Sequence, residues 1–127
     1  MKKSVLVFAI VAILATAIVN VNAATKPEKG LLIGTVVDLT TLAMSGDIEG
    51  NLETAKSRAE HGFPVALIED ETGTVWILAY RNSAPASHLQ VANKIVQDYM
   101  GMQVVMQGLK YKSDGVNAIR FTTISEY

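Results

Sequence analysis

Five short apolar segments, separated by turn-forming residues, constrain the fold of this 127-residue chain more than any other feature. They are rich in β-branched and aromatic residues, which favour strands. The segments span residues 31–39, 65–68, 75–80, 102–111 and 116–124. Gly73 and the Ser113–Gly115 segment stand where chain reversals are needed, because glycine accepts the positive φ of tight turns. The pattern predicts a mainly β domain with five strands.

Two helices are predicted in the connections between these strands. Residues 51–61 show a helical spacing of apolar residues, with Asn51 placed to cap the start and Gly62 placed to end the helix. The second helix is predicted to begin at Ser87, because Ser87–Gln90 matches a capping box. The helices therefore fall between strands one and two and between strands three and four.

The resulting order is strand, helix, strand, strand, helix, strand, strand. This is the order of an OB-fold, a five-stranded Greek-key barrel, in which a helix connects strands three and four. The helix between strands one and two is an insertion in that scheme. A generic α+β sandwich with the same elements is the alternative. We favour the barrel because the first strand is apolar on both of its faces.

The first 23 residues have the layout of a secretory signal peptide. Two lysines at positions 2 and 3 precede an uncharged apolar run over residues 5–19, and small residues end the segment at Ala23. Cleavage is expected after Ala23. An uncleaved membrane anchor is the alternative, but the apolar run is shorter than the ~20 residues that a bilayer span needs.

The expected organisation is a signal peptide over residues 1–23, a polar tether over residues 24–29 and one domain over residues 30–127. This places the protein in the periplasm or outside the cell. The absence of cysteine excludes disulfides, thiol catalysis and thiolate metal sites.

The charge balance argues against a nucleic-acid partner. Without the two lysines of the signal, 9 of the 11 basic residues remain against 12 acids, so the mature net charge is −3. Binding to phosphate backbones needs clustered cations. The basic residues of the domain form no run and are interpreted as solvated charges: Lys56, Arg58, Lys110, Lys112 and Arg120.

Four segments, in this order and spacing, carry a resemblance to a known group of proteins: Gly34–Asp38, Gly62–Leu67, Thr74–Leu78 and Met102–Tyr111. On these residues the chain resembles small exported bacterial OB-fold proteins of poorly defined function. Many such proteins carry cysteines, which would align near Thr41, Thr54 and Arg58 of this chain. Since none of these positions is a thiol, the resemblance implies the scaffold and the export but no redox or metal role.

Catalytic motifs are not visible in the sequence. The two histidines, His61 and His88, belong to no Ser-His-Asp arrangement, and the chain has no glycine-rich phosphate loop. Asp38 and Asp70 could act as an acid–base pair, but no spacing argument brings them together. We therefore expect a protein that is not an enzyme and that carries no cofactor.

Aromatic residues of the strands are the best candidates for a binding site. Trp76, Leu78 and Tyr80 share one face of the third strand, and Tyr111 lies in the fourth. Aromatic side chains on an OB barrel often form a binding surface. These four residues are expected to recognise an exported protein or a small ligand, unless the helices cover this face of the strand.

Two other functions remain open at this stage. Met102, Met106 and His88 could bind Cu(I), because soft thioether sulfur suits this ion, although methionine also fills gaps in cores. Strand edges left by incomplete barrel closure could pair with another copy and make the protein a subunit of a self-assembling structure.

Overall fold

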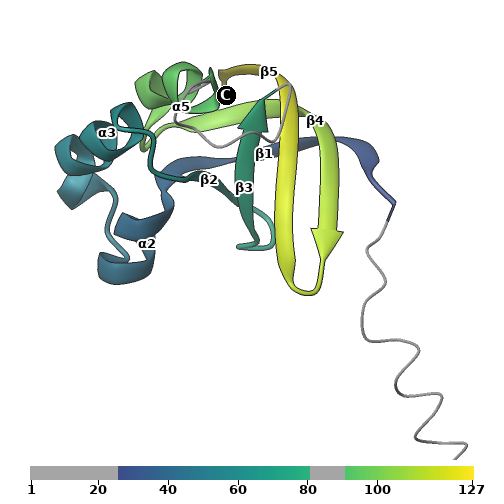
Figure 1. The fold of residues 1–127 in the computed structure, drawn as a ribbon, viewed down its shortest axis with the longest axis horizontal. Coiled ribbons are helices and arrows are strands. Elements are labelled where there is room, and N and C mark those ends of the chain that lie inside the picture. The colour runs from purple at the N-terminus through teal and green to yellow at the C-terminus, as the bar shows by residue number, and fades with distance from the viewer. Residues whose placement is uncertain (1–25, 81–90) are drawn as a thin grey trace, which may run out of the picture.

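Five strands form a closed barrel in the computed structural model, which describes residues 26–80 and 91–127 (Figure 1). The strands are β1 (Glu28–Asp38), β2 (Val65–Glu69), β3 (Val75–Tyr80), β4 (Gln103–Ser113) and β5 (Val116–Glu126). Their order around the barrel is β1-β2-β3-β5-β4, and every pairing is antiparallel except that of β3 with β5. The prediction of a five-stranded barrel is confirmed, and the topology is consistent with an OB-fold-like barrel.

Several predictions about the ends and connections lie outside the described residues. These are the signal peptide with its cleavage site and the capping box at Ser87. The segment expected as a tether is partly inside the fold, because β1 begins at Glu28. Within the part of the chain that the structure describes, no helix has both the length and the apolar character needed to cross a bilayer.

The long strand β1 pairs with both of its neighbours in the barrel, β4 and β2. Its first part pairs with β4 and its last part pairs with β2, and Gly34 takes part in both pairings. A Cβ atom at this position would overlap the carbonyl oxygen of Ile68. Glycine at this position therefore allows the close approach of β1 to the backbone of β2.

Two helices, where one was expected, connect β1 to β2: α2 (Leu39–Ser45) and α3 (Leu52–Glu60), with a 3₁₀ turn at Glu49–Asn51 between them. The prediction missed α2 because its seven residues are too few to show helical periodicity. The helix begins at Asp38, whose side chain accepts a hydrogen bond from the backbone N–H of Thr41 at 2.8 Å. It ends at Gly46, which has a φ of +69°.

The helix predicted over residues 51–61 is present as α3. Gly62 follows it with a φ of +86°, so the predicted stop is confirmed. Asn51 occupies the N-cap position but does not cap the helix with its side chain. Its amide instead donates a hydrogen bond to the carbonyl of Asp47 at 2.7 Å.

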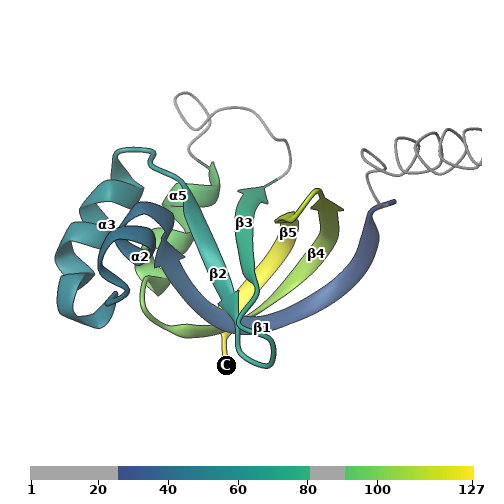
Figure 2. The same cartoon turned by 90° about the horizontal axis from the view of Figure 1, so that it is seen from below.

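The connection between β3 and β4 contains α5 (Val91–Val96) and a 3₁₀ turn (Gln97–Tyr99). The buried amide of Asn93 fastens α5 to the end of α3, because its Nδ2 donates to the carbonyls of Ala59 at 2.9 Å and Phe63 at 2.6 Å. Figures 1 and 2 both show the helices on one side of the barrel, opposite the start of β1 and the β4–β5 hairpin.

Two apolar clusters explain why β1 is apolar on both faces. The larger fills the barrel and extends to the helices, and its largest fully buried members include Trp76, Phe121, Leu67, Met100 and Met106. The smaller lies on the outer side of the barrel wall, where Val37, Ile48 and Ala66 are buried against partly buried residues of α2 and β3. The apolar residues on the outer face of β1, near the end of the strand, are therefore buried by this second cluster.

The glycines at 30 and 108, which face each other across β1 and β4, should respond very differently to substitution. In Gly108→Ala the new Cβ would overlap the carbonyl of Arg120 and lie 2.6 Å from the Cα of Phe121, and this backbone cannot move aside cheaply. We expect a loss of about 2 kcal/mol in the free energy of unfolding, measured by urea denaturation.

Gly30→Ala is the matched control, because the nearest atoms are the movable end of the Lys110 side chain. We expect it to change the unfolding free energy by no more than about 0.5 kcal/mol. Equal losses for the two variants would contradict the described course of β4 and β5.

Candidate functional site

Two of the four residues expected to form a binding surface lie inside the barrel. Trp76 is 2% exposed and Leu78 is 6% exposed, and both belong to the main core. The expectation of an exposed aromatic face on β3 is therefore corrected. Side chains alternate along a strand, and the alternate residue Val75 packs against the smaller outer cluster, so both faces of β3 are covered near its start.

The two tyrosines of the expected site are separated by the barrel wall. Tyr80 is half-buried and packs against the core residue Phe121, with ring centroids 5.1 Å apart. Tyr111 is half-buried and has the guanidinium of Arg120 at 6.0 Å from its ring centroid. Arg120 points away from the barrel interior, because its neighbours Ile119 and Phe121 are inside. Of the four predicted residues, Tyr111 is thus the one on the outer surface of the sheet.

The alternative copper site stays a prediction, because one of its three residues lies outside the described part of the chain. Met106 is fully buried in the core and Met102 is half-buried, while His88 lies outside the described residues. Among residues 26–80 and 91–127, no three His, Cys, Asp or Glu side chains are grouped as a metal site would require.

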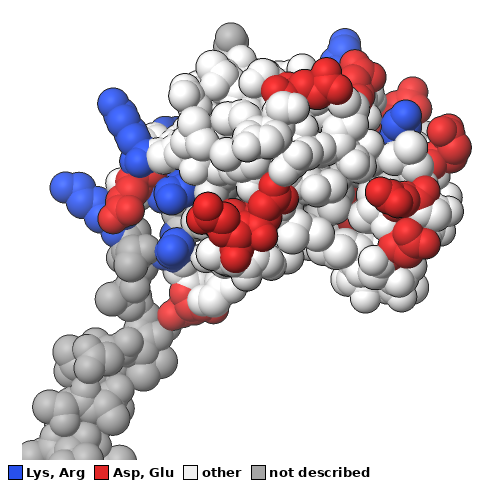
Figure 3. All heavy atoms as spheres, turned by 180° about the vertical axis from the view of Figure 1, so that it is seen from behind, with Lys and Arg blue, Asp and Glu red and all other residues white. Residues whose placement is uncertain are grey.

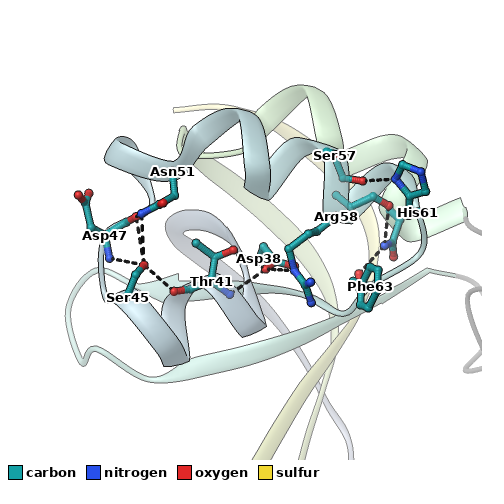
Figure 4. A network of polar contacts seen from close by, with 11 residues as sticks. Asp38, Thr41, Ser45, Asp47, Asn51, Ser57, Arg58, His61 and Phe63 are labelled. Carbon is teal, nitrogen blue, oxygen red and sulfur yellow. Dashed lines mark hydrogen bonds and ion pairs between the residues drawn. The ribbon is translucent and has the colours of Figure 1, made fainter.

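A buried ion pair holds α2 and α3 against the end of β1 (Figure 4). Asp38 is fully buried, and its Oδ2 accepts hydrogen bonds from the N–H and the hydroxyl of Thr41 at 2.8 and 2.7 Å and from the Nε of Arg58 at 2.9 Å. Its other oxygen, Oδ1, has no partner among the described residues. The Arg58 guanidinium also stacks on Phe63, 4.0 Å from the ring centroid.

The contacts of this network join the end of β1 to α2 and α3, so its role is structural. Thr41 and Arg58 are two of the positions at which the resemblance would place cysteines, and both bond Asp38 instead. Asp70 does not join the network as an acid–base partner. Its N–H donates to the carbonyl of Ile33, five residues along β1 from Asp38, which places the two acids about 16 Å apart along the strand.

A groove on the outer face of β1, β4 and β5 is the strongest candidate for a binding site. It has a volume of about 680 Å³ and is lined by Lys29, Gly30, Leu31, Gln107, Gly108, Leu109, Arg120 and Thr122. Lys29, Leu109 and Arg120 lie directly opposite one another across the three strands. Residues in such a row share a sheet face, so the two cations flank an apolar floor. Leu31, 48% exposed, extends this floor.

The groove lies at the basic end of an acidic protein. Figure 3 shows most of the lysines and arginines of that face gathered where the described chain begins, while acids predominate over the rest of it. The strand register brings Lys110 opposite Glu28 and brings Lys29 and Arg120 to either side of Leu109. A local positive potential of this kind attracts anionic ligands.

The sequence pattern did not bring Lys29 and Arg120 together. They are far apart in the sequence, and no run of basic residues marks the pair. The pairing of β4 with β1 and β5 places them on either side of Leu109. Sequence reasoning would have needed the strand register to find this site.

Comparisons of the chain with protein-family models, with curated proteins and with solved structures gave no match.

Proposed function

We propose that the chain is an exported, non-catalytic binding module with an OB-fold, and that it binds an acidic, partly apolar segment of another exported protein in the groove. The observation that carries this proposal is the placement of Lys29 and Arg120 on either side of Leu109. An extended segment with alternating acidic and apolar side chains complements such a row. Export is inferred from the first 23 residues.

Arg120 is suited to hold a carboxylate of such a segment. Its guanidinium offers several N–H donors in a planar arrangement, which can bind a carboxylate with two hydrogen bonds. The Tyr111 ring beside it at 6.0 Å restricts its motion, so that less conformational freedom is lost on binding. This gives Tyr111 a role at the interface, as expected from the sequence, through the arginine that it supports.

Charge reversal in the groove tests this function. We expect the double variant Lys29→Glu, Arg120→Glu to bind a fluorescein-labelled peptide of alternating glutamate and leucine at least about tenfold more weakly, as measured by fluorescence anisotropy. The expected loss corresponds to about 1.4 kcal/mol, because two attractive contacts become repulsive.

The matched control is Lys56→Glu, Lys94→Glu, which makes the same change in net charge on the two helices α3 and α5. Equal weakening by both double variants would show a non-specific charge effect and overturn the proposal. Tighter binding of a single-stranded DNA oligonucleotide than of the peptide would also overturn it, in favour of a nucleic-acid partner.

Self-assembly is the second candidate, and one feature of β1 favours it. Residues 28–32 pair with β4 on one edge, and no described strand pairs with their other edge. Such an edge can bind a strand of another copy. Lys26, Pro27 and Lys29 stand at this edge, however, and lysine and proline discourage strand pairing. Light scattering over a range of protein concentrations tests self-assembly. A molecular mass that stays at the monomer value at every concentration would contradict it.

A further inference from the structure

A second hollow lies on the outer face of the barrel, near the end of β1, whereas the groove lies near its start. It has a volume of about 450 Å³. Thr35 and Val37 of β1 line it, together with Leu42 of α2 and Ile68 of β2. Because Val37, Leu42 and Ile68 belong to the smaller outer cluster, the floor of this hollow is apolar.

Acidic side chains surround this floor, and we call the hollow the acidic groove. Asp47, Glu49 and Asp70 line it and are exposed, and the described residues that line it include no lysine or arginine. Asp47 accepts a hydrogen bond from the N–H of Gly50 at 2.9 Å, and Asp70 accepts one from the side-chain amide of Gln103. A carboxylate has two oxygens with about four acceptor positions, so each can also accept hydrogen bonds from a cation.

The strand β1 carries both grooves on one face. Lys29 and Leu31 line the groove, and Thr35 and Val37 line the acidic groove. These are alternate residues of the strand, so their side chains share its outer face, with the half-buried Ile33 between them. At a rise of about 3.3 Å per residue, the path from Lys29 to Val37 is about 26 Å long. The two grooves therefore form one continuous surface with a positive end and a negative end.

We propose that one extended segment of the partner occupies both grooves, with an acidic half in the groove and a basic half in the acidic groove. This inference rests on the proposed function, because it extends the chemistry of the segment that binds the groove. The opposite charges of the two ends favour it, and so do the apolar side chains of Leu31 and Ile33 between them. Two linked halves bind more tightly than either half alone, because binding of the second half is intramolecular.

Two peptides of identical composition test this order of charges. Both have about twelve residues, which in an extended conformation are enough to cover the path along β1. The block peptide has alternating glutamate and leucine in one half and alternating lysine and leucine in the other, and it is made in both orders. The mixed peptide alternates glutamate and lysine along its whole length, with leucine between them.

Fluorescence anisotropy with labelled peptides measures the two affinities. We expect one order of the block peptide to bind at least about fivefold more tightly than the mixed peptide, because each half of the mixed peptide meets like charge as well as opposite charge. This difference should shrink as sodium chloride is added, since salt screens interactions between exposed charges.

Glu49→Lys, Asp70→Lys reverses the charge of the acidic groove. We expect this variant to lose the preference for the block peptide and to bind a peptide of glutamate and leucine alone more tightly than the wild-type protein does. Glu60→Lys, Asp98→Lys is the matched control, because it makes the same change in net charge at two exposed residues outside the described lining of both grooves. The control should keep the preference. Circular dichroism confirms that each variant is folded.

Equal affinities for the block and mixed peptides would overturn this inference, and so would a preference that Glu49→Lys, Asp70→Lys leaves unchanged. Self-association of the wild-type protein that this double variant abolishes would overturn it in favour of a second copy in the acidic groove. Failure of the proposed function gives a different result, in which Lys29→Glu, Arg120→Glu binds the peptide of glutamate and leucine as tightly as the wild-type protein does. If the inference alone fails, that peptide still binds through Lys29 and Arg120.

Discussion

Trp76→Ala is expected to cost about 4 kcal/mol in the free energy of unfolding, the largest effect of any substitution considered for this protein. The indole is 2% exposed and packs in the main core, so its removal loses apolar burial and leaves a cavity that the closed barrel cannot fill by collapsing. The contacts with the ammonium groups of Lys110 and Lys112 are lost as well.

Urea denaturation followed by far-UV circular dichroism measures this loss, since the variant has no tryptophan to report by fluorescence. Tyr111→Ala is the matched control, because it removes a half-buried aromatic ring from the outer face, and we expect it to cost about 1 kcal/mol. If Trp76→Ala were as stable as the control, the ring could not be inside the barrel. Because the substitution destabilises the fold, weaker binding of a partner by Trp76→Ala would not by itself show that Trp76 contacts that partner.

Asp38→Ala is expected to cost about 3 kcal/mol. The substitution removes the cap of α2 and leaves the Nε of Arg58 without its carboxylate partner. Breaking a buried pair from one side costs more than the pair contributes, because the remaining charge keeps its desolvation penalty. Arg58 is 27% exposed, so part of its charge regains contact with water, and the loss stays at the lower end of the usual range.

Asp47→Ala provides the comparison, because Asp47 is also an aspartate that accepts a backbone hydrogen bond, from Gly50 at 2.9 Å, but is exposed. We expect it to cost about 0.5 kcal/mol or less. Thermal or urea denaturation measures the loss in unfolding free energy for both variants. Equal small losses would mean that Arg58 and α2 hold their places without Asp38.

The strands could be predicted because each is long enough to show its own pattern. The segment 75–80 coincides with β3, and Asp114 and Gly115 form the predicted hairpin turn with φ values of +47° and +80°. The helix α2 could not be predicted in the same way. It depends on a cap from Asp38 and on an apolar cover over the outside of the barrel, which are features of the folded chain.

The candidate site could be predicted only in part. Periodicity shows that Trp76 and Leu78 share a face, but it does not show which face of β3 points inward when both are apolar. Tyr111 was identified as a site residue because it is aromatic, whereas its partner Arg120 was interpreted as a solvated charge. The ion pair between Asp38 and Arg58 joins residues twenty positions apart, and no local pattern reveals such a contact.

The parallel pairing of β3 with β5 has a consequence for the order in which this protein can fold. Residues 77–80 pair with residues 118–121, and β5 also pairs with β4 along its whole length. Until β5 has been synthesised, β3 and β4 each keep an unpaired edge, and no arrangement of the earlier strands closes the barrel. Such non-local pairing delays folding. For a chain exported as proposed here, the delay keeps the polypeptide unfolded, and so able to pass through a narrow channel, until its last strand is available.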